Sequence, residues 1–158
     1  MSTSMVFLLA LLIGVVCGLR SLTGPALVCW GAHFGWLNLS GSHLAFVKNV
    51  LALFIFTLLA VLELIGDKTA RIPRRTTPGP LIFRLLMGAL CGAVFAIAGG
   101  ASVGICCVLG ALGALIGTYA GYWVRHSVTG EGKLPDFPVA LIEDVIAIGG
   151  GLFLVSRF

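Results

Sequence analysis

Residues 138–151 read Pro-Val-Ala-Leu-Ile-Glu-Asp-Val-Ile-Ala-Ile-Gly-Gly-Gly and decide the fold of this 158-residue chain. They lie in a run from Phe137 to Val155 that is apolar except for Glu143 and Asp144. Such a run is long enough to cross a bilayer as a helix, which takes about 20 residues at about 1.5 Å each. A charge near the middle of that helix costs at least about 2.5 kcal/mol, so the two acids are expected to face a cavity, a partner or a proton path rather than lipid.

The composition is that of a membrane protein with several helices. Hydrophobic residues make up 59% of the chain and charged residues only 10%, whereas a soluble domain carries about 25% charged residues. The length leaves room for four or five spans and for no separate soluble domain, so residues 1–158 are expected to form a single polytopic domain. The 22 glycines follow no collagen-like period and indicate close helix packing. Those at 104, 110, 113, 117 and 121 recur at spacings of three and four, which puts most of them on one helix face.

The apolar runs predict the helices. The predicted fold class is an all-α integral membrane protein with four full transmembrane helices plus a short re-entrant or interfacial helix. The short helix is assigned to 26–37, because an apolar stretch of about 10–14 residues is more often re-entrant or interfacial than transmembrane. The predicted helices are about 5–19, 26–37 (short), 44–65, 81–98, 102–124 and 137–155.

Positive charge is concentrated in two connections between the apolar runs, and such connections stay on the cytoplasmic side of a membrane. We therefore expect a bacterial inner-membrane protein with the N-terminus inside, the C-terminus outside and the connection at 68–84 in the cytoplasm; if 26–37 crosses the membrane, the N-terminus moves outside. The basic connection at 68–84 is a poor nucleic-acid site, because its prolines make it a short and stiff connector. The basic residues are Lys68, Arg71, Arg74, Arg75 and Arg84 in the first connection, and Arg125 and Lys133 in the second.

Four carboxylates are the first candidate binding residues. With this topology, Glu63 and Asp67 lie at the cytoplasmic end of the helix at 44–65, and Glu143 and Asp144 enter from the same side. Carboxylates gathered in the inner half of the membrane bind a cation through oxygen ligands, or share protons because they are crowded and desolvated. If a cation binds, Glu63, Glu143 and Asp144 are its expected metal ligands.

Arg20 is the fifth candidate, because it follows Gly18 at a break between two predicted helices. It is expected to be a buried counter-charge or the anion-binding part of a half-helix end. A structural role is the alternative for all five residues. Arg20 would then anchor the chain at the interface, Glu63 would reach the membrane surface, and Asp67 would belong to an ordinary helix end. The two acids of the last helix would pair with Arg20 or Arg84 and lock the fold.

The other reactive side chains form no catalytic or metal motif. No metal-ligand spacing, nucleophile–base pair, phosphate-binding glycine loop or H-E-x-x-H motif is present. We therefore expect cysteines that act as small buried hydrophobic residues, histidines at the membrane boundary, no catalytic residue, and no cofactor apart from a bound cation. The residues concerned are Cys17, Cys29, Cys91, Cys106, Cys107, His33, His43 and His126.

Short motifs spread over nearly the whole chain carry a resemblance to a known family. They are Gly18-Leu-Arg-Ser21, Trp36, Glu63 with Asp67-Lys68, Pro135-Asp-Phe137, Glu143-Asp144 and Ala147-Ile-Gly-Gly-Gly151. This set resembles a bacterial membrane family catalogued as domain of unknown function 4126. The resemblance implies a small polytopic inner-membrane protein and brings no established activity.

A second resemblance concerns the end of the helix at 44–65. Glu63-Leu-Ile-Gly-Asp67-Lys-Thr69 is similar to the Glu-x-Gly-Asp-Lys/Arg-Ser/Thr signature of calcium/manganese–proton exchangers. One residue is inserted here between the acid and the glycine, which changes the helical angle between Glu63 and Asp67. The second copy of the motif is missing, because Glu143-Asp144 lacks the Gly-Asp-Lys pattern.

The function predicted from these features is transport or conduction of a small solute, coupled to a cation or proton through the buried carboxylates. The expected partners are the lipid bilayer, a small solute or ion, and further copies of the chain, since so small a protein encloses little. No nucleic acid is expected. The alternatives are a membrane-embedded lipid-handling protein or enzyme, and an accessory subunit without its own activity.

Overall fold

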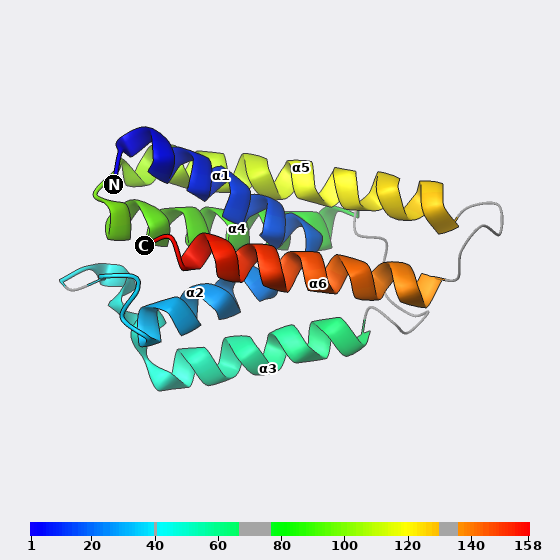
Figure 1. Ribbon diagram of the computed structural model, residues 1–158, viewed down its shortest axis with the longest axis horizontal. Helices are drawn as coiled ribbons and strands as arrows, with labels where there is room; N and C mark the ends of the chain where they lie inside the picture. Colours follow the sequence, from blue (N-terminus) through cyan, green and yellow to red (C-terminus); the bar gives the residue numbers. More distant parts are fainter. Residues whose placement is uncertain (40, 67–76, 130–135) are drawn as a thin grey trace.

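In the computed structural model, residues 1–39, 41–66, 77–129 and 136–158 are described, and within them the chain forms helices and no strand (Figure 1). The predicted all-α class is therefore confirmed. The elements are α1 (Thr3–Leu19), α2 (Thr23–His33), the 3₁₀ helix η1 (His43–Lys48), α3 (Val50–Gly66), α4 (Pro78–Gly99), α5 (Val103–Thr129) and α6 (Asp136–Val155).

Local sequence explains where α4 and α5 begin and end. Pro78 and Pro80 lack amide hydrogens that the first turn of a helix leaves unbonded, so α4 begins a few residues before the expected 81. Gly100 ends α4 in the left-handed conformation (φ 67°), with its N–H bonded to carbonyls of the last turn. α5 continues past the expected 124 to Thr129, so that the second predicted connection loses its first residues to the helix.

Glycines let α1, α4 and α5 pack backbone to backbone. A Cβ atom added at Gly113 of α5 would overlap the carbonyl oxygen of Leu11 in α1, and one added at Gly88 of α4 would overlap the carbonyl oxygen of Gly110. The predicted glycine face of α5 thus exists at Gly110 and Gly113, where only a residue without a side chain allows such close approach. Gly104 is different, because an added Cβ atom would meet nothing within 4 Å.

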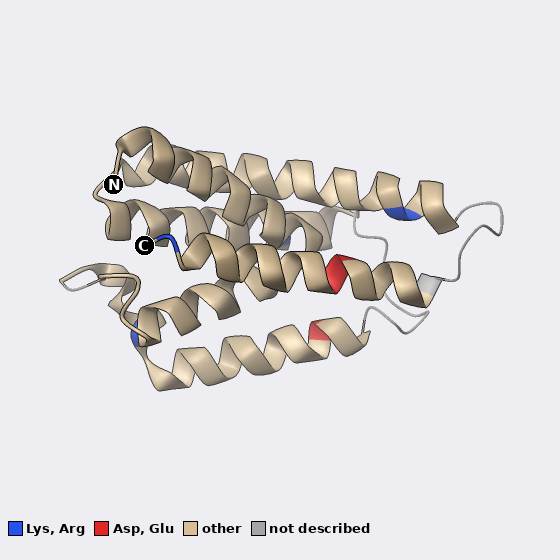
Figure 2. Ribbon diagram, viewed as in Figure 1, with Lys and Arg blue, Asp and Glu red and all other residues tan. Residues whose placement is uncertain are grey.

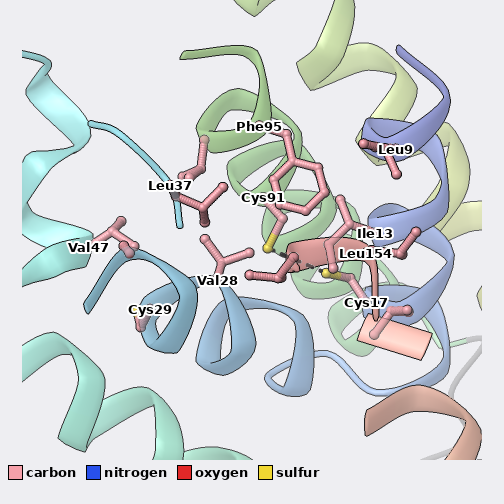
Figure 3. Packing of buried hydrophobic residues seen from close by; sticks show 14 of the residues in the cluster. Leu9, Ile13, Cys17, Val28, Cys29, Leu37, Val47, Cys91, Phe95 and Leu154 are labelled. Atoms are coloured by element: carbon pink, nitrogen blue, oxygen red, sulfur yellow. Dashed lines mark hydrogen bonds between the residues drawn. The ribbon is translucent and has the colours of Figure 1, made fainter. Parts of the chain in front are cut away.

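The apolar core lies where α1, α2 and α4 meet (Figure 3). Ile13, Cys17, Val28, Cys91 and Phe95 are at most 1% exposed, and the sulfur atoms of Cys17 and Cys91 are 3.7 Å apart. The thiols are unpaired and pack as small hydrophobic groups, as the sequence predicted. The remaining cysteines are Cys29 and Cys106, which are buried, and Cys107, which is partly buried.

Both termini lie at the same end of the bundle (Figure 1). The rings of Phe95 and Phe158 are 4.7 Å apart, and Met1, Met5 and Phe158 line one cavity together with Gly99. The prediction of an N-terminus inside and a C-terminus outside is therefore not confirmed. The reason is α2, which begins near the C-terminal end of α1 and leads the chain back to the end of the bundle where α1 started.

Among the described residues, three helices are long and apolar enough to cross a membrane by length and composition, namely α4, α5 and the part of α6 from Phe137. α1 and α3 are apolar but have 17 residues each, so four full spans are not confirmed. α2 has 11 residues, a length of about 16 Å, which is about half of the hydrocarbon core. α3 packs against α2 and η1 and buries fully only Ala60.

Candidate functional site

The helical structure is interrupted between α1 and α2, inside the bundle; this interruption is called the α1–α2 break. α1 ends at Leu19 and α2 begins at Thr23, and Arg20 between them has an extended backbone (φ −139°, ψ 110°). Arg20 is 0% exposed and Thr23 is 3% exposed. Ends of helices leave backbone carbonyl and amide groups without intrahelical partners, and away from water these groups need other partners.

Residues of α4 and α5 bind the carbonyl end of α1. The guanidinium of Arg84 donates through Nη1 to the carbonyl oxygens of Gly18 and Leu19, the latter at 3.0 Å. The hydroxyl oxygen of Thr118 lies 3.2 Å from the carbonyl oxygen of Gly18. A cation at the carbonyl end of a helix also interacts favourably with the helix dipole, by about 0.3–1 kcal/mol or more when partly buried.

Glu63 of α3 binds the amide end of α2. Its Oε1 atom accepts hydrogen bonds from the backbone N–H of Ser21 at 2.8 Å and from the Ser21 hydroxyl at 2.5 Å, and its Oε2 atom accepts one from the N–H of Leu22 at 2.8 Å. An anion at the amide end of a helix complements the dipole there. Because Nη2 of Arg84 lies 3.8 Å from Oε1 of Glu63, one ion pair links the two helix ends.

Arg20 pairs with the two acids of α6. Its Nη2 atom lies 2.5 Å from Oδ1 of Asp144 and 4.0 Å from Oε2 of Glu143. Glu143 in turn lies 4.0 Å from Nη1 of Arg125 in α5. Asp144 is 5% exposed, so the ion pair of Arg20 and Asp144 is almost wholly removed from solvent. Each of the two charges is stable there only because the other is present.

These contacts form two sets of ion pairs in the half of the bundle away from the termini, where the acidic positions of α3 and α6 lie (Figure 2). The sets are linked by the backbone of Ser21, which follows Arg20 and donates to Glu63, and together they are called the network. Its members come from the α1–α2 break, α3, α4, α5 and α6. They are Arg20, Arg84 and Arg125 with Glu63, Glu143 and Asp144. Three guanidinium groups face three carboxylates, so the formal charge of the network is zero.

Residues 7–156 match the family described as "Domain of unknown function (DUF4126)". The chain belongs to the DUF4126 family. No curated protein and no solved structure matched it. The comparisons do not show the similarity to calcium/manganese–proton exchangers, and Asp67 to Thr69 of that motif lie outside the described residues.

In this DUF4126 protein, the structure brings together four of the five predicted site residues. Arg20, Glu143 and Asp144 form one set of ion pairs, and Glu63 joins them through the α1–α2 break. The fifth residue, Asp67, lies outside the described part of the chain. Each of the three described carboxylates lies within 4.0 Å of an arginine guanidinium. In the part of the chain that the structure describes, no group of three or more His, Cys, Asp or Glu side chains could hold a metal ion.

Two arginines of the site, Arg84 and Arg125, were not among the predicted site residues. Arg84 was assigned to a basic connection and named only as a possible structural partner, yet it lies in the second turn of α4 and is 6% exposed. Pro78 and Pro80 are the signal that places it inside a helix, because proline favours the first turn. Arg125 was likewise assigned to a connection and lies in α5, one turn before its end.

Proposed function

We propose that this protein is a small transporter of the bacterial inner membrane that moves a small monovalent anion together with a proton. The observation that supports this most is Arg20, which is 0% exposed and pairs with Asp144 at 2.5 Å where α1 and α2 are broken. Membrane transporters build solute sites from such breaks, in which helix ends and charged side chains turn to the interior.

The arginines favour a proton over a metal cation as the coupling ion. Asp144 and Glu143 both lie within 4.0 Å of Arg20, and Glu63 lies 3.8 Å from Arg84. A metal cation needs several oxygen ligands and is repelled by guanidinium groups at this distance. A proton binds to one carboxylate oxygen and removes the negative charge that pairs with the arginine.

The zero charge of the network gives a reason for coupling the proton to an anion. Protonation of Asp144 leaves the positive charge of Arg20 without its closest counter-charge, which is unfavourable in a buried site. A monovalent anion that binds to Arg20 restores neutrality. The proton and the anion therefore bind and leave together, because either one alone leaves an unpaired buried charge.

Flux into proteoliposomes tests this proposal with a panel of small monovalent anions of strong acids, such as chloride, bromide and nitrate. Anion uptake and internal pH are followed together while the outside is made acidic. The expected result for the wild-type protein is accumulation of at least one of these anions with uptake of one proton for each. If the acid gradient drives no anion of the panel, the proposal is wrong.

Two variants separate coupling from folding. Asp144→Asn keeps the shape of the side chain but cannot exchange a proton, so proton-driven uptake should be abolished while exchange of anion for anion without a gradient persists. Arg157→Gln, at an exposed position at the other end of the bundle, is the control and should behave as wild type. If Asp144→Asn and Glu143→Gln are both lost from the membrane, the acids serve the fold rather than transport.

A further inference from the structure

A groove opens on the surface between α5 and α6, beside the last turns of α1, and has a volume of about 370 Å³. Its walls are mainly apolar and include Val15 of α1, Val124 of α5 and Ile142 of α6. Two charged side chains, Arg125 and Glu143, also border it. The groove is therefore an apolar depression along the helices, and Arg125 and Glu143 are the two charged residues that line it.

The position of the groove indicates what fills it. α5 and α6 are both long and apolar enough to cross a membrane. If both helices cross it, the groove between them opens to the hydrocarbon. Its wall on α5 runs from Ala120 to Val128, a helix length of about 12 Å. The hydrocarbon of one leaflet is about 15 Å deep. The part of the groove from Arg125 to Ala120 is about 7.5 Å long, so it covers about half of one acyl chain.

The polar border suits a lipid headgroup. Arg125 lies one turn from the end of α5, its side chain is 19% exposed, and its Nη1 atom is 4.0 Å from Glu143. A guanidinium group has five N–H donors, so it can hold the carboxylate and a phosphate at the same time. Arginine also matches the planar geometry of phosphate oxygens better than lysine does.

We propose that this groove is a phospholipid site, with one acyl chain between α5 and α6 and the lipid phosphate at Arg125. Lipid tails are as apolar as the walls of the groove, so burial of the tail alone does not select this place. The shape of the groove and the phosphate contact provide the preference. This site borders the proposed proton and anion path, because Glu143 also lies 4.0 Å from Arg20, but it does not depend on that proposal.

Photo-crosslinking tests where the chain of the lipid lies. The protein is reconstituted in vesicles of phosphatidylethanolamine and phosphatidylglycerol that contain a phospholipid with a diazirine in its acyl chain, and adducts are located by peptide mass spectrometry. Adducts should be several-fold enriched on 120–128 and 139–146 relative to the exposed apolar face of α3, which includes Phe54 and Leu58. Equal labelling of both faces would overturn the proposal.

A matched pair of tryptophan variants on α5 sharpens this result. Ala120→Trp fills the groove from an exposed position and should remove most adducts on 139–146. Leu112→Trp adds the same ring to the exposed face of α5, at a residue that is 46% exposed and does not line the groove, and should leave them unchanged. Unchanged adducts in Ala120→Trp would show that the chain lies elsewhere.

Native mass spectrometry tests the phosphate contact. Protein released from the same vesicles should retain phospholipid, and Arg125→Gln should lower the retained fraction several-fold. Arg157→Gln is the control, because it removes an arginine from the opposite end of the bundle and should retain lipid as wild type does. Equal retention in both variants would overturn the assignment of Arg125 to the lipid phosphate.

Discussion

Arg84 shows how single side chains hold the broken helices. Its guanidinium binds carbonyl oxygens of α1 and pairs with Glu63, which binds the amides that precede α2.

Removing one member of a buried ion pair costs about 3–5 kcal/mol because the other charge is left without a partner, whereas removing both costs less than the sum. We therefore expect Arg84→Gln and Glu63→Gln each to lower the melting temperature in detergent, and the double variant to be less destabilised than the two effects added. Arg84→Lys keeps the charge without the forked donors and should fall between Arg84→Gln and wild type. Additive effects in the double variant would contradict the coupling.

At the scale of elements, the contacts of α5 with α1 depend on glycine. Gly113 and Gly104 are on the same helix, but an added Cβ atom would overlap the carbonyl oxygen of Leu11 only at Gly113. Gly113→Ala should therefore destabilise the protein by about 1–3 kcal/mol, as overpacked positions do. Gly104→Ala is the matched control and should be neutral or slightly stabilising, because alanine favours the helix by up to about 1 kcal/mol. Thermal unfolding of the two purified variants checks this, and equal melting temperatures would show that α1 and α5 are farther apart.

At the scale of the whole molecule, the arrangement of the helices places both termini at the same end of the bundle. Reporter fusions at the N-terminus and at the C-terminus, one active only in the cytoplasm and one only outside it, should therefore report the same compartment. Since the basic connections favour the cytoplasm, we propose that this compartment lies outside. Reporters in opposite compartments would contradict the fold, and two cytoplasmic termini would contradict only the orientation. Assembly into a homo-oligomer stays a prediction.

The sequence by itself determined the membrane class, the all-α architecture and most of the candidate residues. These follow from local properties: 59% hydrophobic residues, apolar runs of helical length, and acids placed inside such runs. The glycine face of α5 was equally visible, because spacings of three and four define one side of a helix.

Only the tertiary structure decided which charges meet and where the chain ends lie. Arg84 and Gly18 are 66 positions apart, and hydropathy contains no information about such pairs. The sequence left a pairing of Glu143 and Asp144 with Arg20 or Arg84 as an open alternative, and the fold selects Arg20. The direction of α2 was equally hidden, because a helix of 11 residues fits both a return at one surface and a passage through the bundle. Its partners decide between them: Glu63 at its amide end, and the α1 carbonyls held by Arg84, make a break inside the bundle stable.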